Sequence, residues 1–394
     1  MRRSSSEQGF SLIEMTVAMG LMLVVTGSIF ALLNPGQGNF VAEPEVADLQ
    51  QRARVAADTL YKDLVMVGSG SYSGDSAMAL SYFFAPVLPF RQGRLQDDPP
   101  GTFRTDAITL MLVPATTAQS TIEKDMPAQS AELKVNEDPN CPPKKGDELC
   151  GFKEGMSVLL FDETGSYDLF TITEVQDQAL HLQHNLDDLS KVYGGLVPGP
   201  PAKIVQIQSH TYYLRTDVAT KTYQLMHYDG ADNDVPIVDN VVGLEFEYFG
   251  DPQPPVTNGK PFANPVGPWT TYGPAPRLNG TNCVFFNDGS PIPAPVLPVL
   301  GPGGTTTTLV KLTKEQLTDG PWCPNPDSPN RFDADLYRIR KIGVRIRLQT
   351  GNDSLRGPAS ALFTYGGTSR GGNKYIPDQE VRFQVTPRNL NLGR

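Results

Sequence analysis

One carboxylate stands inside the most apolar stretch of this chain of 394 residues. Glu14 comes four residues into a run that begins at Phe10, and residues 15–33 carry no charge. An ionisable group costs about 3 kcal/mol near the centre of a bilayer, and a buried charge is tolerated only when it is paired. Glu14 therefore predicts a cationic partner that the segment itself does not supply.

Four cysteines are a second source of chemistry, and they fall into two neighbourhoods, Cys141 with Cys150 and Cys283 with Cys323. No two are spaced as C-x-x-C and no histidine lies near them, so the spacing of zinc ligands is absent. If the body of the protein is exported, two disulfides are expected, each stabilising the fold by roughly 2–4 kcal/mol. The connectivity stays open, and four buried thiols in a cytosolic protein are the alternative.

The acidic turn over residues 229–234 could hold a hard cation. Asp229, Asp232 and Asp234 offer the oxygen ligands that Ca²⁺ takes. Their spacing is not that of an EF-hand and acidic turns are common, so calcium is the lesser hypothesis. His181 and His184 would lie on opposite faces of a strand, so no metal is expected there and no other cofactor is predicted.

A local basic strip consists of Arg338, Arg340, Lys341, Arg345 and Arg347. An acidic partner or DNA would suit it, but the favoured interpretation is the solvated face of a strand. The net charge of -10 and the pI near 5.0 argue against a dedicated nucleic-acid binder. The chain has no G-x-S-x-G, H-E-x-x-H or P-loop motif, so an enzyme is not predicted.

The apolar segment must position Glu14, and it is predicted to be a membrane helix. A helix over residues 10–33 would be about 36 Å long, enough to span a bilayer. Arg2 and Arg3 place its N-terminus in the cytoplasm and the body outside. A conventional signal peptide is cleaved after its apolar core, whereas the small residue Gly9 precedes this one. Cleavage at Gly9 would therefore keep the helix on the mature protein.

The run GFSLIE over residues 9–14 resembles the prepilin motif of type IV pilins and type II secretion pseudopilins. The resemblance implies that prepilin peptidase cuts between Gly9 and Phe10, leaving residues 1–9 as the leader. It also implies that Phe10 is N-methylated and that Glu14 pairs with the terminal ammonium of a neighbouring subunit. An uncleaved signal anchor is the alternative.

Proline and glycine follow the membrane helix and predict a break over residues 34–44. A second helix is expected over residues 45–67, as the amphipathic helix of the head. Its apolar residues recur at three- and four-residue spacing: Val46, Leu49, Ala53, Ala56, Leu60, Leu64 and Val67. Gly68 is predicted to end it.

Residues 68–394 form a β-rich head with two insertions, over residues 116–152 and 251–330. Apolar runs without intervening helices predict antiparallel strands and an α+β fold rather than a parallel nucleotide-binding sheet. The expected strands are residues 107–113, 157–161, 168–175, 204–214, 223–228, 244–249, 342–348 and 381–385.

Three further phrases, over residues 48–64, 239–248 and 381–390, are similar to PilW-like minor pilins and to PulJ- and GspJ-like pseudopilins. The implied fold is type IV pilin-like, with a long interrupted N-terminal helix packed on an antiparallel sheet. The implied function is that of a minor type IV pilin at or near the pilus tip, which helps prime assembly and serves adhesion or motility.

The resemblance also implies partners and a location. The partners are other minor pilins, the major pilin, prepilin peptidase and a tip adhesin. The chain would be a single-pass inner-membrane protein with a periplasmic head before assembly and part of a cell-surface pilus afterwards. The alternatives are a minor pseudopilin of a type II secretion system, a DNA-uptake minor pilin and an anchored periplasmic enzyme.

Overall fold

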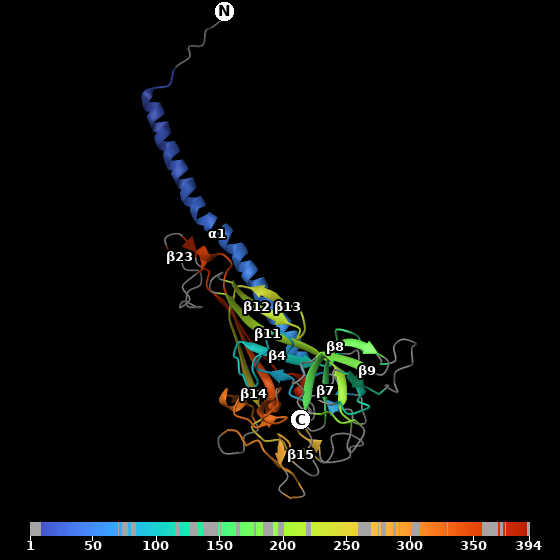
Figure 1. Cartoon of the computed structure of the whole chain (residues 1–394). Coiled ribbons are helices and arrows are strands. Elements are labelled where there is room, and N and C mark those ends of the chain that lie inside the picture. Colours follow the sequence, from blue (N-terminus) through green and yellow to red (C-terminus); the bar gives the residue numbers. More distant parts are fainter. Residues whose placement is uncertain are drawn as a thin grey trace, which may run out of the picture. The chain divides into compact units, whose positions relative to one another are not determined.

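The computed structural model of the chain is α+β, with one long helix followed by antiparallel sheets (Figure 1). Two compact units divide it: residues 1–52 with 348–379, and residues 53–347 with 380–394. The structure describes residues 9–69, 71–72, 78–79, 84–114, 118–126, 132–136, 149, 151–162, 166–176, 179–183, 192–195, 201–217, 222–258, 269–274, 276, 281–286, 289–290, 292–301, 308–328, 330–356, 369–370, 373–374 and 376–391.

Helix α1 (Leu12–Met66) is a single element of 55 residues, and Figure 1 shows its ribbon running on without a gap. The break predicted over residues 34–44 is therefore wrong. The φ of proline, near −65°, is itself helical, and glycine can also be helical at a cost of about 1 kcal/mol. Pro35 and Pro44 each remove one backbone donor, but neither removal requires the helix to end.

The C-terminal part of α1 packs on the head along the predicted stripe. Its apolar side chains are 0–3% exposed: Leu49, Ala53, Ala56, Leu60, Leu64 and Val67. Val46 is 38% exposed, so the prediction was wrong at that position. The helix ends as expected: Gly68 has a φ of 68°, and its N–H donates to the carbonyl of Met111 at 2.9 Å.

Three sheets build the head, and every strand pairing described within them is antiparallel. The six-stranded sheet has the order β5 (Gln119–Thr121), β10 (Lys203–Gln206), β7 (Ser157–Phe161), β8 (Tyr167–Gln176), β9 (Ala179–Gln183), β6 (Glu132–Lys134). The five-stranded sheet has the order β13 (Asp234–Asp239), β12 (Thr222–Tyr228), β11 (Gln208–Asp217), β4 (Ala107–Leu112), β3 (Val87–Leu88). The four-stranded sheet has the order β19 (Val310–Leu312), β14 (Val241–Gly250), β22 (Ile339–Leu348), β25 (Gln379–Val385).

Short elements complete the described chain. The two-stranded ribbons are β1 (Ser71–Tyr72) with β2 (Met78–Ala79), β15 (Thr257–Asn258) with β16 (Trp269–Thr270), β17 (Phe285–Phe286) with β18 (Ala294–Pro295), β20 (Trp322–Cys323) with β21 (Phe332–Asp333), and β23 (Ser369–Arg370) with β24 (Asn373–Lys374). The 3-10 turns are η2 (Glu315–Leu317), η3 (Ala334–Arg338), η4 (Asp353–Leu355) and η6 (Arg388–Asn391).

Both segments interpreted as insertions supply strands to the sheets. From the first, β5 and β6 form the two edges of the six-stranded sheet, and their neighbours Ile122 and Val135 are buried in its core. From the second, β19 pairs with β14 at the edge of the four-stranded sheet. The described parts of these segments therefore belong to the fold itself.

In the other unit, residues after β22 pack against the helix. Thr350 donates a hydrogen bond to the carboxylate of Glu45 at 2.5 Å, and the guanidinium of Arg52 donates to the carbonyl of Gln349 at 3.4 Å. Ala42 is 7% exposed in the same region. This part of α1 therefore makes hydrogen bonds to a C-terminal segment that its own sequence does not indicate.

Candidate functional site

The predicted processing site lies at the start of α1, where Glu14 forms a helix cap. The N–H of Ser11 donates to a carboxylate oxygen of Glu14 at 2.9 Å, and the Ser11 hydroxyl accepts from the N–H of Ile13 at 3.3 Å. This is the reciprocal S-x-x-E capping box, with Ser11 at the cap and Glu14 at the third helical position. Phe10 is 87% exposed and Gly9 has open space around it.

This capping role is a local function of Glu14 that the sequence interpretation did not include. The S-x-x-E spacing is visible in the printed sequence and could have revealed it. Such a cap contributes about 1 kcal/mol to helix stability. The carboxylate thus contacts the N–H of Ser11, the residue that follows Phe10, whose amine cleavage after Gly9 would expose.

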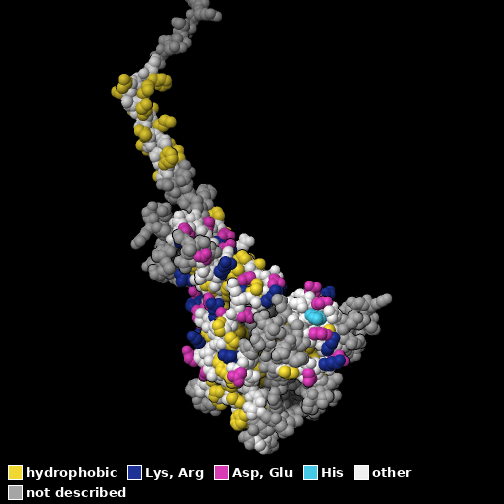
Figure 2. All heavy atoms as spheres, viewed as in Figure 1, with side chains coloured by type: hydrophobic (Ala, Val, Ile, Leu, Met, Phe, Trp, Pro, Cys, Tyr) yellow, Lys and Arg dark blue, Asp and Glu magenta, His cyan; other side chains and the backbone are white. Residues whose placement is uncertain are grey.

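The segment that follows is apolar on all sides. Over Leu12–Ala31 the helix has a mean hydropathy of 1.9, and none of it is buried within the protein. Its length of 20 residues corresponds to about 30 Å, the thickness of the hydrocarbon core of a bilayer. Figure 2 shows hydrophobic side chains along this stretch of α1. By length and composition it is suited to a single membrane span or a signal sequence.

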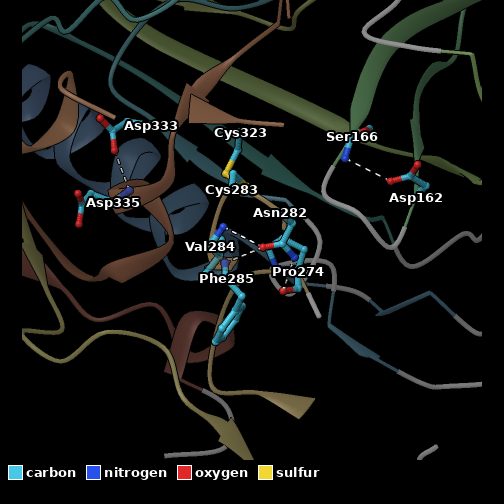
Figure 3. The surroundings of a disulfide bond; sticks show 10 residues. All are labelled: Asp162, Ser166, Pro274, Asn282, Cys283, Val284, Phe285, Cys323, Asp333 and Asp335. Carbon is cyan, nitrogen blue, oxygen red and sulfur yellow. Dashed lines mark hydrogen bonds between the residues drawn. A yellow bond between two sulfur atoms is a disulfide. The ribbon is translucent and has the colours of Figure 1, made fainter. Parts of the chain in front are cut away.

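The disulfide between Cys283 and Cys323 joins residues 40 positions apart, with Cα atoms separated by 5.1 Å (Figure 3). Both cysteines are buried. Beside them Asn282 accepts hydrogen bonds from the N–H groups of Val284 and Phe285, at 2.9 and 2.7 Å. One of the two expected disulfides is therefore present, within one of the two cysteine neighbourhoods, while Cys141 and Cys150 lie outside the described residues.

Asp333 lies on β21, the strand that pairs with the strand carrying Cys323. Its two carboxylate oxygens accept from the N–H of Asp335 at 2.8 Å and from the N–H of Gly320 at 2.7 Å. Asp333 is 1% exposed, and this burial raises the pKa of its carboxyl to about 7. The proton is therefore held more tightly in the folded chain than in the unfolded chain.

The raised pKa of Asp333 predicts a pH-dependent stability. Between about pH 4 and pH 7 the folded chain binds more protons at this carboxyl than the unfolded chain does, so its contribution to stability falls as the pH rises. In urea unfolding across this range, the free energy of unfolding should fall less, or rise more, with increasing pH in Asp333→Asn than in the natural protein. Equal slopes in the two proteins would contradict a raised pKa.

The three aspartates considered for calcium are directed to separate partners. Asp229 caps its own turn by accepting from the N–H groups of Ala231 and Asn233. Asp232 pairs with Arg94, and Asp234 pairs with the buried Arg91 while accepting from Tyr213. These carboxylates therefore hold loops together. Their hydrogen bonds leave the calcium hypothesis without support from the geometry.

The basic strip is divided by burial. Arg338 and Arg340 are 0% and 5% exposed, so the interpretation as a solvated face was wrong for both. Arg340 donates to the carbonyl oxygens of Tyr337 and Ile339 at 2.8 and 2.9 Å. Arg345 is exposed and forms an ion pair with Glu245, as a solvated strand face predicts.

A cluster that the sequence interpretation missed lies between α1 and the five-stranded sheet. His210 Nδ1 is 2.8 Å from His227 Nε2 and 3.2 Å from Asp63 Oδ2, and the Tyr212 hydroxyl donates to Asp63 Oδ2 at 2.6 Å. Among the residues that the structure describes, only Asp63, His210 and His227 gather as a group able to hold a metal ion. Burial and His210 together lower the pKa of His227.

Strand register brings the two histidines together. Tyr212 on β11 lies opposite His227 on β12, which places His210 two residues away on the same face. A prediction of the register between these two strands would have indicated that His210 and His227 lie close together. Without the register, His210 and His227 were two unrelated positions in two predicted strands.

No family model matches the chain, and comparisons with curated proteins and with solved structures also found no match. What the molecule does must therefore be inferred from its own residues. The features that carry the inference are the exposed apolar helix, its capping glutamate and the stapled β-rich head.

Proposed function

We propose that this chain is a minor type IV pilin, a structural subunit rather than an enzyme. The observation that carries the proposal is the placement of Glu14. A carboxylate lies on the first turn of a fully exposed apolar helix, one turn from the Gly9–Phe10 bond. The GFSLIE sequence resembles the prepilin motif at the same residues.

Assembly in this proposal depends on chemistry at the start of α1. Prepilin peptidase removes residues 1–9, and the amine of Phe10 becomes the new N-terminus and is methylated. Glu14 of one subunit then pairs with this ammonium group on a neighbour, and the apolar surfaces of the helices pack together. A charge in an apolar bundle is tolerated only when it is paired. Subunits are therefore stable only at the axial offset that brings Glu14 to the ammonium group, and the pair fixes their register.

The β-rich head is the part that remains outside the filament core. In the proposal it is periplasmic before assembly and exposed at or near the pilus tip afterwards. Other minor pilins, the major pilin and a tip adhesin are its partners. The disulfide between Cys283 and Cys323 suits such a location, because disulfides persist in oxidising compartments.

Fractionation of pili tests the location. The processed chain should appear in sheared pilus fractions at a low ratio to the major pilin, and deletion of its gene should reduce surface piliation. The alternative, a minor pseudopilin, predicts normal piliation and impaired protein secretion in the same deletion strain. A chain found only as the full precursor in inner membranes would contradict both versions.

A further inference from the structure

Asp63, His210 and His227 present three metal-binding atoms to one point. The three come from α1, β11 and β12, and their ligand atoms all lie within 4.8 Å of one another. Each of the three residues is half-buried. Two imidazoles and one carboxylate suit a first-row transition ion such as Zn²⁺ better than Ca²⁺ or Mg²⁺, which prefer oxygen ligands.

The distances are close to those of a coordinated ion. Bonds of about 2.0–2.1 Å in a tetrahedral site place ligand atoms about 3.3 Å apart. The two separations from His210 Nδ1, 2.8 Å and 3.2 Å, differ from this value by a few tenths of an ångström, and all three ligand atoms lie within 4.8 Å of one another.

Hydrogen bonding alone satisfies this group poorly. His210 Nδ1 carries at most one hydrogen, yet both His227 Nε2 and Asp63 Oδ2 lie within bonding distance of it. Asp63 Oδ2 already accepts from the Tyr212 hydroxyl. A cation at the centre would engage all three lone pairs at once, and Tyr212 would orient the ligating carboxylate as an outer-shell partner does.

We infer that Asp63, His210 and His227 bind one Zn²⁺ ion, with a solvent molecule as the fourth ligand. The ion clamps the C-terminal part of α1 to the β11–β12 hairpin. This inference concerns the head alone and does not depend on the proposed function. The site resembles open three-ligand zinc sites in composition, and its role here is to hold an element in place.

Titration of the full-length protein in detergent tests the site directly. The protein is prepared without a histidine tag, stripped with EDTA and titrated with ZnCl₂ in a calorimeter. One ion should bind per chain, with micromolar affinity or tighter, and Tm should rise with the Zn²⁺ concentration as mass action requires. Co²⁺ in place of Zn²⁺ should give the visible absorption of a four-coordinate site, while Mg²⁺ and Ca²⁺ should not bind there.

Three variants separate this site from adventitious binding. His227→Gln should lose the Co²⁺ absorption and weaken Zn²⁺ binding at least tenfold, and Tyr212→Phe should weaken it by about 10–100-fold. His181→Gln, at a histidine on β9 outside the group, should bind as the natural protein does. Circular dichroism verifies that each variant is folded. The inference is overturned if the natural protein binds no Zn²⁺, or if His227→Gln binds it unchanged.

Discussion

Replacing Glu14 by alanine is expected to leave the chain in the inner membrane and to remove it almost completely from assembled pili. Two interactions are lost at once. The N–H of Ser11 loses its acceptor, which costs the helix about 1 kcal/mol. In the proposed filament, the terminal ammonium of a neighbour also loses its counter-ion in an apolar bundle, at a cost of about 3–5 kcal/mol. Immunoblots of sheared pili against membrane fractions would measure the loss.

Glu14→Gln is the matched variant that separates the two roles. Glutamine keeps the acceptor that the capping box requires, but it carries no charge. If the ion pair is the essential interaction, Glu14→Gln fails to assemble just as Glu14→Ala does. Normal assembly of the glutamine variant would show that Glu14 acts only as a helix cap, and normal assembly of both would remove it from the account altogether.

Replacing Arg338 by methionine is expected to destabilise the head more than any change to a surface charge. Its side chain is fully buried and forms an ion pair with Asp335. It also donates to the carbonyl oxygens of three consecutive residues and of one distant proline: Asp251, Pro252, Gln253 and Pro298. Removing one partner of a buried pair costs about 3–5 kcal/mol, and here the carbonyls would lose their donor too.

Arg345→Met is the control for this prediction, because Arg345 lies on β22, close to Arg338 in sequence, and is also ion-paired. Its pair with Glu245 is exposed, so the variant should change the free energy of unfolding by less than about 1 kcal/mol. Urea titration of both variants measures the difference. Similar losses in the two would mean that Arg338 contributes no more than a surface charge.

Much of the fold follows from local patterns in the sequence. Strand β7 (Ser157–Phe161) has the bounds predicted for it, and the apolar stripe from Leu49 to Val67 is buried. These elements are predictable because a period of two or of 3.6 marks a face that must leave water. The cap at Gly68 is predictable for a similar local reason, since the chain there needs a positive φ.

One strand boundary shows where such patterns fail. A single strand over residues 204–214 was predicted, but the chain leaves the six-stranded sheet after Gln206 and enters the five-stranded sheet at Gln208. Ile207 between them is buried, and no glycine or proline marks the change. A strand that passes from one sheet to another without a turn residue keeps an apolar pattern, so periodicity alone cannot locate the boundary.

The site residues that were missed depend on distant partners. Arg338 was interpreted as a surface charge because its carbonyl partners lie 40 to 87 residues away along the chain. Asp63 and His210 are likewise far apart in sequence and meet only when α1 packs on the sheet. Single-sequence patterns indicate which face is buried, but not which polar groups meet across the contact.

The most direct test of the central proposal is the mass of the mature N-terminus. Mass spectrometry of the chain purified from its natural membrane should find a terminal peptide that begins at Phe10 and carries one additional methyl group. Residues 1–9 should be absent from that preparation. A peptide that begins at Met1, or one cleaved after the apolar segment near Ala31, would contradict the account, because α1 could not then present Phe10 and Glu14 to a neighbouring subunit.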